Sequence, residues 1–120
     1  MPKKKQPEFI DRINNPEKYP YIANKDGSVS SHRMAAETDE NGNWFVFPTI
    51  QFDGRKLTHF KNKRKAMANA IATGNFLPMA SKEEALNYAE GGYKKGTPLE
   101  TYNPLGEKAK TAQTFKEAVE

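Results

Sequence analysis

The residues that could perform acid–base or metal chemistry are few in this sequence and lie far apart. There are two histidines, His32 and His59, and no cysteine, which excludes disulfides and thiolate chemistry. The two histidines match neither His-x-x-x-His nor His-Glu-x-x-His, the patterns that place two imidazoles on one helix face to bind zinc. We therefore expect no metal site, no cofactor and no catalytic residue, and we predict a protein that is not an enzyme.

Two other catalytic arrangements compete with this prediction. Ser30 and His32 lie two residues apart, on the same face of one expected strand. They could form a hydrolytic triad with Asp26 or Asp53, but no Gly-x-Ser-x-Gly nucleophile turn accompanies them. The acidic side chains within residues 37–40 could supply paired carboxylates for sugar hydrolysis. They stand beside a glycine turn, so the simpler interpretation is that they are solvated loop acids.

The positive charge of the chain is concentrated in one segment. The net charge is +4, and residues 55–80 carry six basic side chains and no acidic one. A cluster of this kind attracts phosphate backbones or acidic protein surfaces, whereas its plainest interpretation is the solvated start of a helix. The candidate phosphate-binding residues are Arg55, Lys56, Lys61, Lys63, Arg64 and Lys65.

Residues 21–57 have the pattern of an antiparallel sheet. The Asn-Gly dipeptide at 41–42 is a strong hairpin signal, because a type I′ turn needs positive φ at both central positions. It joins an expected strand at 29–38 to the dense apolar run 44–52, which we expect to be covered on both faces. Pro48 cannot donate a ladder hydrogen bond, so this strand must be an edge or bulge at that point.

Two short helices are expected to pack on this sheet, over residues 62–73 and 82–90. Asn62 is a candidate N-cap of the first helix, and Gly74 stands where a C-terminal glycine usually ends a helix. Ser81 begins a Ser-x-x-Glu capping box at the start of the second. The sequence therefore predicts an α+β fold in which a small antiparallel hairpin sheet is packed by two short helices.

Extended arms are expected on both sides of this body. We divide the chain into an N-terminal arm at 1–20, a compact α+β domain at 21–95, and a linker with a C-terminal amphipathic helix at 96–120. Both arms carry apolar stripes, which could pack on the body or bind a partner. The residues predicted as partner anchors are Phe9, Ile10, Ile13, Leu105, Phe115 and Val119.

Five short motifs occur in an order that is familiar from one group of proteins. They are Asn24–Met34 (NKDGSVSSHRM), Gly42–Ile50 (GNWFVFPTI), Asp53–Leu57 (DGRKL), Ala70–Gly74 (AIATG) and Glu84–Ala89 (EALNYA). In this series the chain resembles a small domain that recurs in proteins of tailed bacteriophages, often in virion-associated or DNA-ejection proteins and sometimes beside peptidoglycan-cleaving domains. The resemblance supplies no catalytic residue.

The resemblance implies a non-enzymatic structural or accessory protein of a phage virion. It would be a tail or ejection component, made in the cytoplasm of the bacterial host. Its expected partners are other virion proteins in many copies. The alternatives are a basic nucleic-acid-binding accessory protein and an envelope-penetration accessory that acts with a separate lytic enzyme. No apolar run approaches the roughly 20 residues that span a bilayer, so no membrane span is expected.

Overall fold

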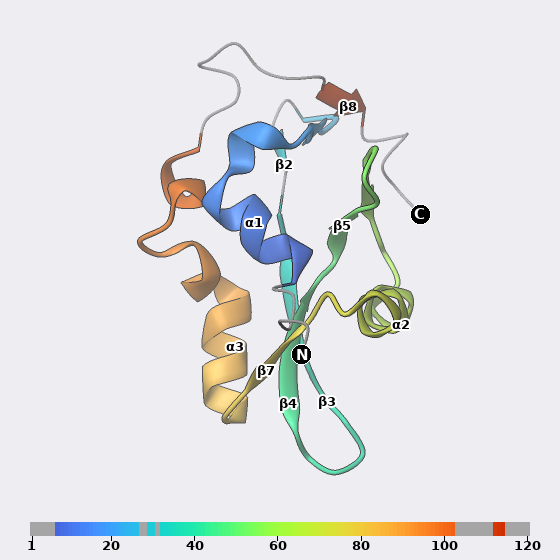
Figure 1. Cartoon of the computed structure of the whole chain (residues 1–120), viewed down its shortest axis with the longest axis vertical. Coiled ribbons are helices and arrows are strands. Elements are labelled where there is room, and N and C mark those ends of the chain that lie inside the picture. Colours follow the sequence, from blue (N-terminus) through green and yellow to red (C-terminus); the bar gives the residue numbers. More distant parts are fainter. Residues whose placement is uncertain (1–6, 27–28, 31, 103–111, 115–120) are drawn as a thin grey trace, which may run out of the picture.

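A computed structural model describes residues 7–26, 29–30, 32–102 and 112–114 of the chain. These residues form an α+β fold with small, mainly antiparallel sheets and three α-helices (Figure 1). The expected fold class is therefore confirmed. Within the described ranges, no helix is long and apolar enough to cross a membrane.

The elements follow one another along the chain with short connections. The α-helices are α1 (Glu8–Asn14), α2 (Lys63–Thr73) and α3 (Lys82–Glu90), and the 3₁₀ turns are η1 (Pro16–Lys18), η2 (Gly92–Lys94) and η3 (Pro98–Thr101). The strands are β1 (Tyr21–Ala23), β2 (Val29–Ser30), β3 (Met34–Thr38), β4 (Trp44–Pro48), β5 (Ile50–Phe52), β6 (Leu57–His59), β7 (Leu77–Met79) and β8 (Ala112–Thr114).

The β3–β4 hairpin is the centre of the fold. A hairpin forms where it was predicted, but its turn is not the expected type I′ turn, because Gly42 has positive φ and Asn41 does not. The Asp39 carboxylate accepts hydrogen bonds from the backbone N–H groups of Asn41 and Asn43, each at 2.9 Å. Gly42 has φ +82°, a conformation that favours glycine. β7 joins the other edge of β4, which gives an antiparallel sheet in the order β3-β4-β7.

The predicted strand 44–52 is two strands, because the chain changes sheets at Thr49. β4 ends at Pro48, and β5 pairs with β6 in a second sheet. The Thr49 N–H donates to the Arg33 carbonyl at 2.8 Å, which holds the corner. The predicted strand 29–38 is divided in the same way, since β2 pairs with β1 and β3 pairs with β4. The proline therefore marks the end of a strand, as its missing N–H requires.

The two long helices cover opposite faces of β4. Val46 packs in a cluster with Ala85 of α3, whereas the next residue, Phe47, packs with Ala66 and Ala70 of α2. Successive strand residues point to opposite faces, so this alternation requires a helix on each side. The expectation that this strand is covered on both faces is confirmed, and Figure 1 shows α2 and α3 on either side of the hairpin.

The predicted helix ends are confirmed. The Asn62 side chain accepts from the backbone N–H groups of Arg64 and Lys65, and Gly74 ends α2 with φ 73°. The Ser81 hydroxyl accepts from the Glu84 N–H at the start of α3. Caps bind the backbone groups that a helix leaves unpaired, and the capping residues lie within a few positions of those groups. The sequence alone can therefore predict where such a helix begins and ends.

Candidate functional site

Helix α1 belongs to the core of the body, which corrects the prediction of its apolar residues as partner anchors. Phe9 is 0% exposed and Ile13 is 2% exposed, in one cluster with Val46 and Tyr93. Ile10 packs against the same cluster. Of the two alternatives for this stripe, packing on the chain's own body is the one observed. The other predicted anchors, Leu105, Phe115 and Val119, lie outside the described residues.

Polar contacts hold α1 in place as well. Arg12 is buried, and its guanidinium donates to the Glu8 carboxylate at 2.7 Å and to the Ile50 carbonyl of β5 at 2.6 Å. Burial lowers the pKa of Arg12, and Glu8 opposes that effect. The Phe9 N–H donates to the Asn75 side-chain oxygen at 3.1 Å. Helix α1 is thus packed against the rest of the domain by polar as well as apolar contacts.

The predicted basic cluster is divided between two places. Arg55 and Lys56 stand on the exposed β5–β6 turn, where the Asp53 carboxylate accepts from both of their backbone N–H groups. Lys61 and Lys63 instead border a hollow of about 510 Å³. We call this hollow the basic groove, and its lining is Arg33, Met34, Ala35, Ala36, Thr49, His59, Phe60, Lys61, Lys63 and Leu86.

Arg33 and His59 are members of the basic groove that lie outside the predicted cluster of six basic residues. Arg33 immediately precedes β3 and His59 ends β6, and the corner at Thr49 brings these strands together. Burial, followed by the charges of Arg33 and Lys61, lowers the pKa of His59. Lys63 is paired with Glu37 at 3.3 Å. Arg33, Lys61 and Lys63 are the cationic side chains among the residues that line the groove.

The first turn of α2 carries charges of the unfavourable sign. Lys63, Arg64 and Lys65 occupy it, and it contains no acidic residue. Cations at the positive end of a helix dipole cost about 0.3–1 kcal/mol each when exposed. Residues that weaken local structure in this way are more common where function requires them. This turn continues the basic surface that begins in the groove.

A separate apolar groove of about 470 Å³ lies beside β7. Ile71 of α2 is 51% exposed and stands at this groove. The ammonium of Lys82 lies 5.9 Å from the centre of the Trp44 ring. The lining of the apolar groove is Asp39, Asn43, Trp44, Phe45, Ile71, Phe76, Pro78 and Met79.

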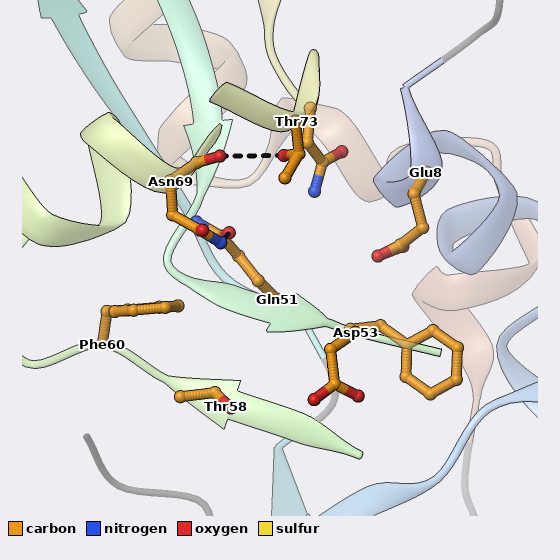
Figure 2. Close-up of a pocket in the computed structure, with 9 residues that line it drawn as sticks. Glu8, Gln51, Asp53, Thr58, Phe60, Asn69 and Thr73 are labelled. Carbon is orange, nitrogen blue, oxygen red and sulfur yellow. Dashed lines mark hydrogen bonds between the residues drawn. The ribbon is translucent and has the colours of Figure 1, made fainter. Parts of the chain in front are cut away.

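The third hollow is a polar cleft of about 460 Å³ between α1, the β5–β6 hairpin and the end of α2 (Figure 2). Its lining combines carboxylates, amides, hydroxyls and two aromatic rings. The residues are Glu8, Gln51, Phe52, Asp53, Thr58, Phe60, Asn69, Thr73 and Asn75. Sequence reasoning missed this cleft, because its members come from four separate stretches of the chain.

His32 does not form the hydrolytic arrangement that was weighed for it. Both ring nitrogens are buried and have no hydrogen-bond partner, while the imidazole lies 5.8 Å from the Phe9 ring and 4.9 Å from the Tyr93 ring. The Ser30 hydroxyl accepts from the Asn24 amide instead. Burial, then the charges of Arg12 and Lys94, holds the pKa of His32 well below its usual value. This histidine is therefore a neutral core residue near pH 7.

No metal centre stands out among the residues that can be placed. Within them, no group of three or more histidine, cysteine, aspartate or glutamate side chains could hold a metal ion. The acids at Asp39 and Asp53 accept backbone hydrogen bonds in their turns, and these bonds lower the pKa of both carboxyl groups. These two acids serve the turns in which they stand.

Comparison of the chain with protein-family models, with curated proteins and with solved structures found no match.

Proposed function

We propose that this chain is a non-enzymatic accessory protein of a tailed-phage virion and that it binds another virion protein through the apolar groove beside β7. The motif series supplies the virion context. The observation that carries the binding mode is the exposure of Ile71 at a groove lined by Trp44, Phe45 and Met79. Large apolar side chains left at a concave surface are typical of protein-interaction sites.

The occupant that suits this groove is a partner with protruding apolar side chains. The contact area on this chain would be small, and many copies of the contact in a symmetric particle would strengthen the binding through avidity. The body of the domain then makes the contact that was predicted for the body and the arms together. Helix α1 contributes indirectly, because it stabilises the core behind the sheet.

Ile71→Asp is expected to reduce incorporation of the chain into particles by about tenfold or more, because a carboxylate in the apolar groove must be desolvated on binding. The measurement is quantitative mass spectrometry of purified virions from cells that express tagged variants. Leu86→Asp is the matched control, since Leu86 is 38% exposed and lies at the basic groove instead. Equal loss of both variants, or of neither, would reject the apolar groove as the binding surface.

Nucleic-acid binding is the second candidate function, and the basic groove is the observation that favours it. The hollow lined by Arg33, Lys61 and Lys63 continues onto the exposed first turn of α2, which adds Arg64 and Lys65. Cations around a concave surface attract a phosphate backbone without reading its sequence.

If the basic groove binds DNA, log affinity should fall linearly with log salt, with a slope of about −0.9 for each phosphate contact. Arg33→Glu combined with Arg64→Glu should reduce that slope by about two contacts. Arg55→Glu, on the β5–β6 turn and outside the groove, is the matched control. Fluorescence anisotropy with a short DNA duplex measures the salt dependence for the unmodified chain and for each variant. Absence of binding at low salt would reject nucleic-acid binding.

A further inference from the structure

The polar cleft contains groups of a kind that recognise a neutral ligand with many hydroxyls. Amides at Asn69 and Asn75 provide both donors and acceptors, while the carboxylates of Glu8 and Asp53 accept. Of the described residues, no lysine, arginine or histidine lines the cleft. A phosphate or other anion would therefore meet two carboxylates without a cation, which disfavours it.

The floor of the cleft is held by hydrogen bonds within the chain. The Gln51 amide donates to the Pro48 and Ala66 carbonyls, each at 2.9 Å, and its oxygen accepts from the Asn69 amide at 2.5 Å. Asn75 is buried and accepts from the Phe9 N–H. These bonds fix the polar side chains before a ligand arrives, which lowers the entropy cost of binding.

One wall of the cleft has an acceptor that is not satisfied. The Glu8 carboxylate points toward the cleft in Figure 2, and its Oε2 accepts from Arg12. Its Oε1 is buried without a hydrogen-bond partner, although the Glu8 side chain as a whole is 29% exposed. A small rotation of the carboxyl group would let a ligand hydroxyl donate to it. The charge of Glu8 is already balanced by Arg12, so the site does not require a cationic ligand.

Aromatic rings complete the cleft. Phe60 borders it beside Gln51 and Thr58 in Figure 2, and Phe52 also lines it. Phe52 is fixed by an edge-on contact with Tyr19, with ring centres 5.0 Å apart. A pyranose ring has a rim of hydroxyls and an apolar C–H face, and this combination of planar polar groups with aromatic rings complements both.

We propose that the polar cleft is a binding site for a neutral carbohydrate, with room for one or two pyranose rings. Its volume of about 460 Å³ is within the usual range for small-molecule sites, about 300–1,000 Å³. Asn69 and Thr58 hydrogen-bond to ring hydroxyls, and Phe60 contacts the C–H face. The site shares no lining residue with the apolar groove and shares Phe60 alone with the basic groove, so it adds a ligand to the proposed function.

The test is an NMR titration of the ¹⁵N-labelled full chain with cellobiose, maltose and methyl α-mannoside. Side-chain amide signals of Gln51, Asn69 and Asn75 should shift and saturate with at least one sugar, at a dissociation constant of about 1 mM. Phe60→Leu should weaken that binding about tenfold. Phe76→Leu is the matched control, because Phe76 packs against the same Phe47 cluster but lines the apolar groove. Thr58→Val is a second variant that removes one hydroxyl.

Several outcomes would overturn the assignment. No saturating shift in the cleft with any of the three sugars rejects it. Saturating shifts with calcium chloride or sodium phosphate, and none with the sugars, would make the cleft an ion site. An equal effect of Phe60→Leu and Phe76→Leu on sugar binding would show that the sugar does not contact Phe60. Incorporation of the Ile71→Asp variant into particles tests the apolar groove, so its result does not depend on whether the polar cleft binds a sugar.

Discussion

Phe9→Ala is expected to lower the free energy of unfolding by about 3–5 kcal/mol. The Phe9 ring is fully buried among the core residues between α1 and the central sheet, so its removal leaves a cavity there. Domains of this size have only about 5–15 kcal/mol of stability, so the variant should be close to unfolding at physiological temperature. Urea denaturation followed by circular dichroism measures the change.

Ile71→Ala is the control for this prediction. Ile71 is 51% exposed, so its truncation should change stability by less than about 0.5 kcal/mol. If Phe9→Ala is equally harmless, α1 does not pack on the body in solution. The interpretation of residues 1–20 as an extended arm that binds a partner would then be restored.

Acid is expected to destabilise the fold from about pH 6.5 downward through His32. In the unfolded chain a histidine has its usual pKa near 6.5, whereas burial holds the folded-state pKa of His32 well below it. The unfolded state therefore binds the proton first, and stability is present above pH 6.5 and is lost as the pH falls toward the folded-state pKa. The loss approaches about 1.4 kcal/mol for each pH unit in this window.

The charged groups around His32 also lower its pKa. Arg12 of α1 and Lys94 of η2 are the charges that lower its pKa, and the adjoining rings of Phe9 and Tyr93 offer no carboxylate to stabilise an imidazolium. His59 also has a lowered pKa and contributes in the same window. The lowered carboxyl pKa values, such as that of Asp53, affect stability only at more acidic pH, below about 4.

His32→Phe should flatten the dependence of stability on pH between 5 and 7, since it keeps an aromatic ring but cannot bind a proton. His59→Phe should flatten it less. Unfolding midpoints in urea at several pH values measure both slopes. An unchanged slope in His32→Phe would show that His32 is not buried in its neutral form.

The parts of the fold that the sequence predicted are those specified by neighbouring residues. The Asn62 and Gly74 helix ends and the turn at Asp39 depend on side chains within four positions of the backbone they satisfy. The alternating burial of Val46 and Phe47 likewise follows from a dense apolar run. Local signals of this kind can be read without knowing the tertiary contacts.

The features that could not be predicted depend on contacts between distant segments. β8 is a strand where a C-terminal amphipathic helix was expected. It pairs in parallel with β1, from the opposite end of the chain, and no local pattern indicates that pairing. The burial of Arg12 depends on a carbonyl at Ile50. The polar cleft and the basic groove both need the change of sheet at Thr49, which the proline at 48 indicated only as an edge or bulge. The candidate sites in the structure are therefore surfaces assembled from distant segments, whereas the sequence indicated contiguous runs of residues.

We propose that this chain is docked in a phage particle through the apolar groove, and cross-linking mass spectrometry of intact particles is the most direct test. Lys82 lies next to Trp44 at the groove, whereas Lys18 stands on η1, away from it. We predict that amine cross-links join Lys82 to another virion protein more often than they join Lys18. Absence of the chain from purified particles, or cross-links from Lys18 with none from Lys82, would contradict the claim.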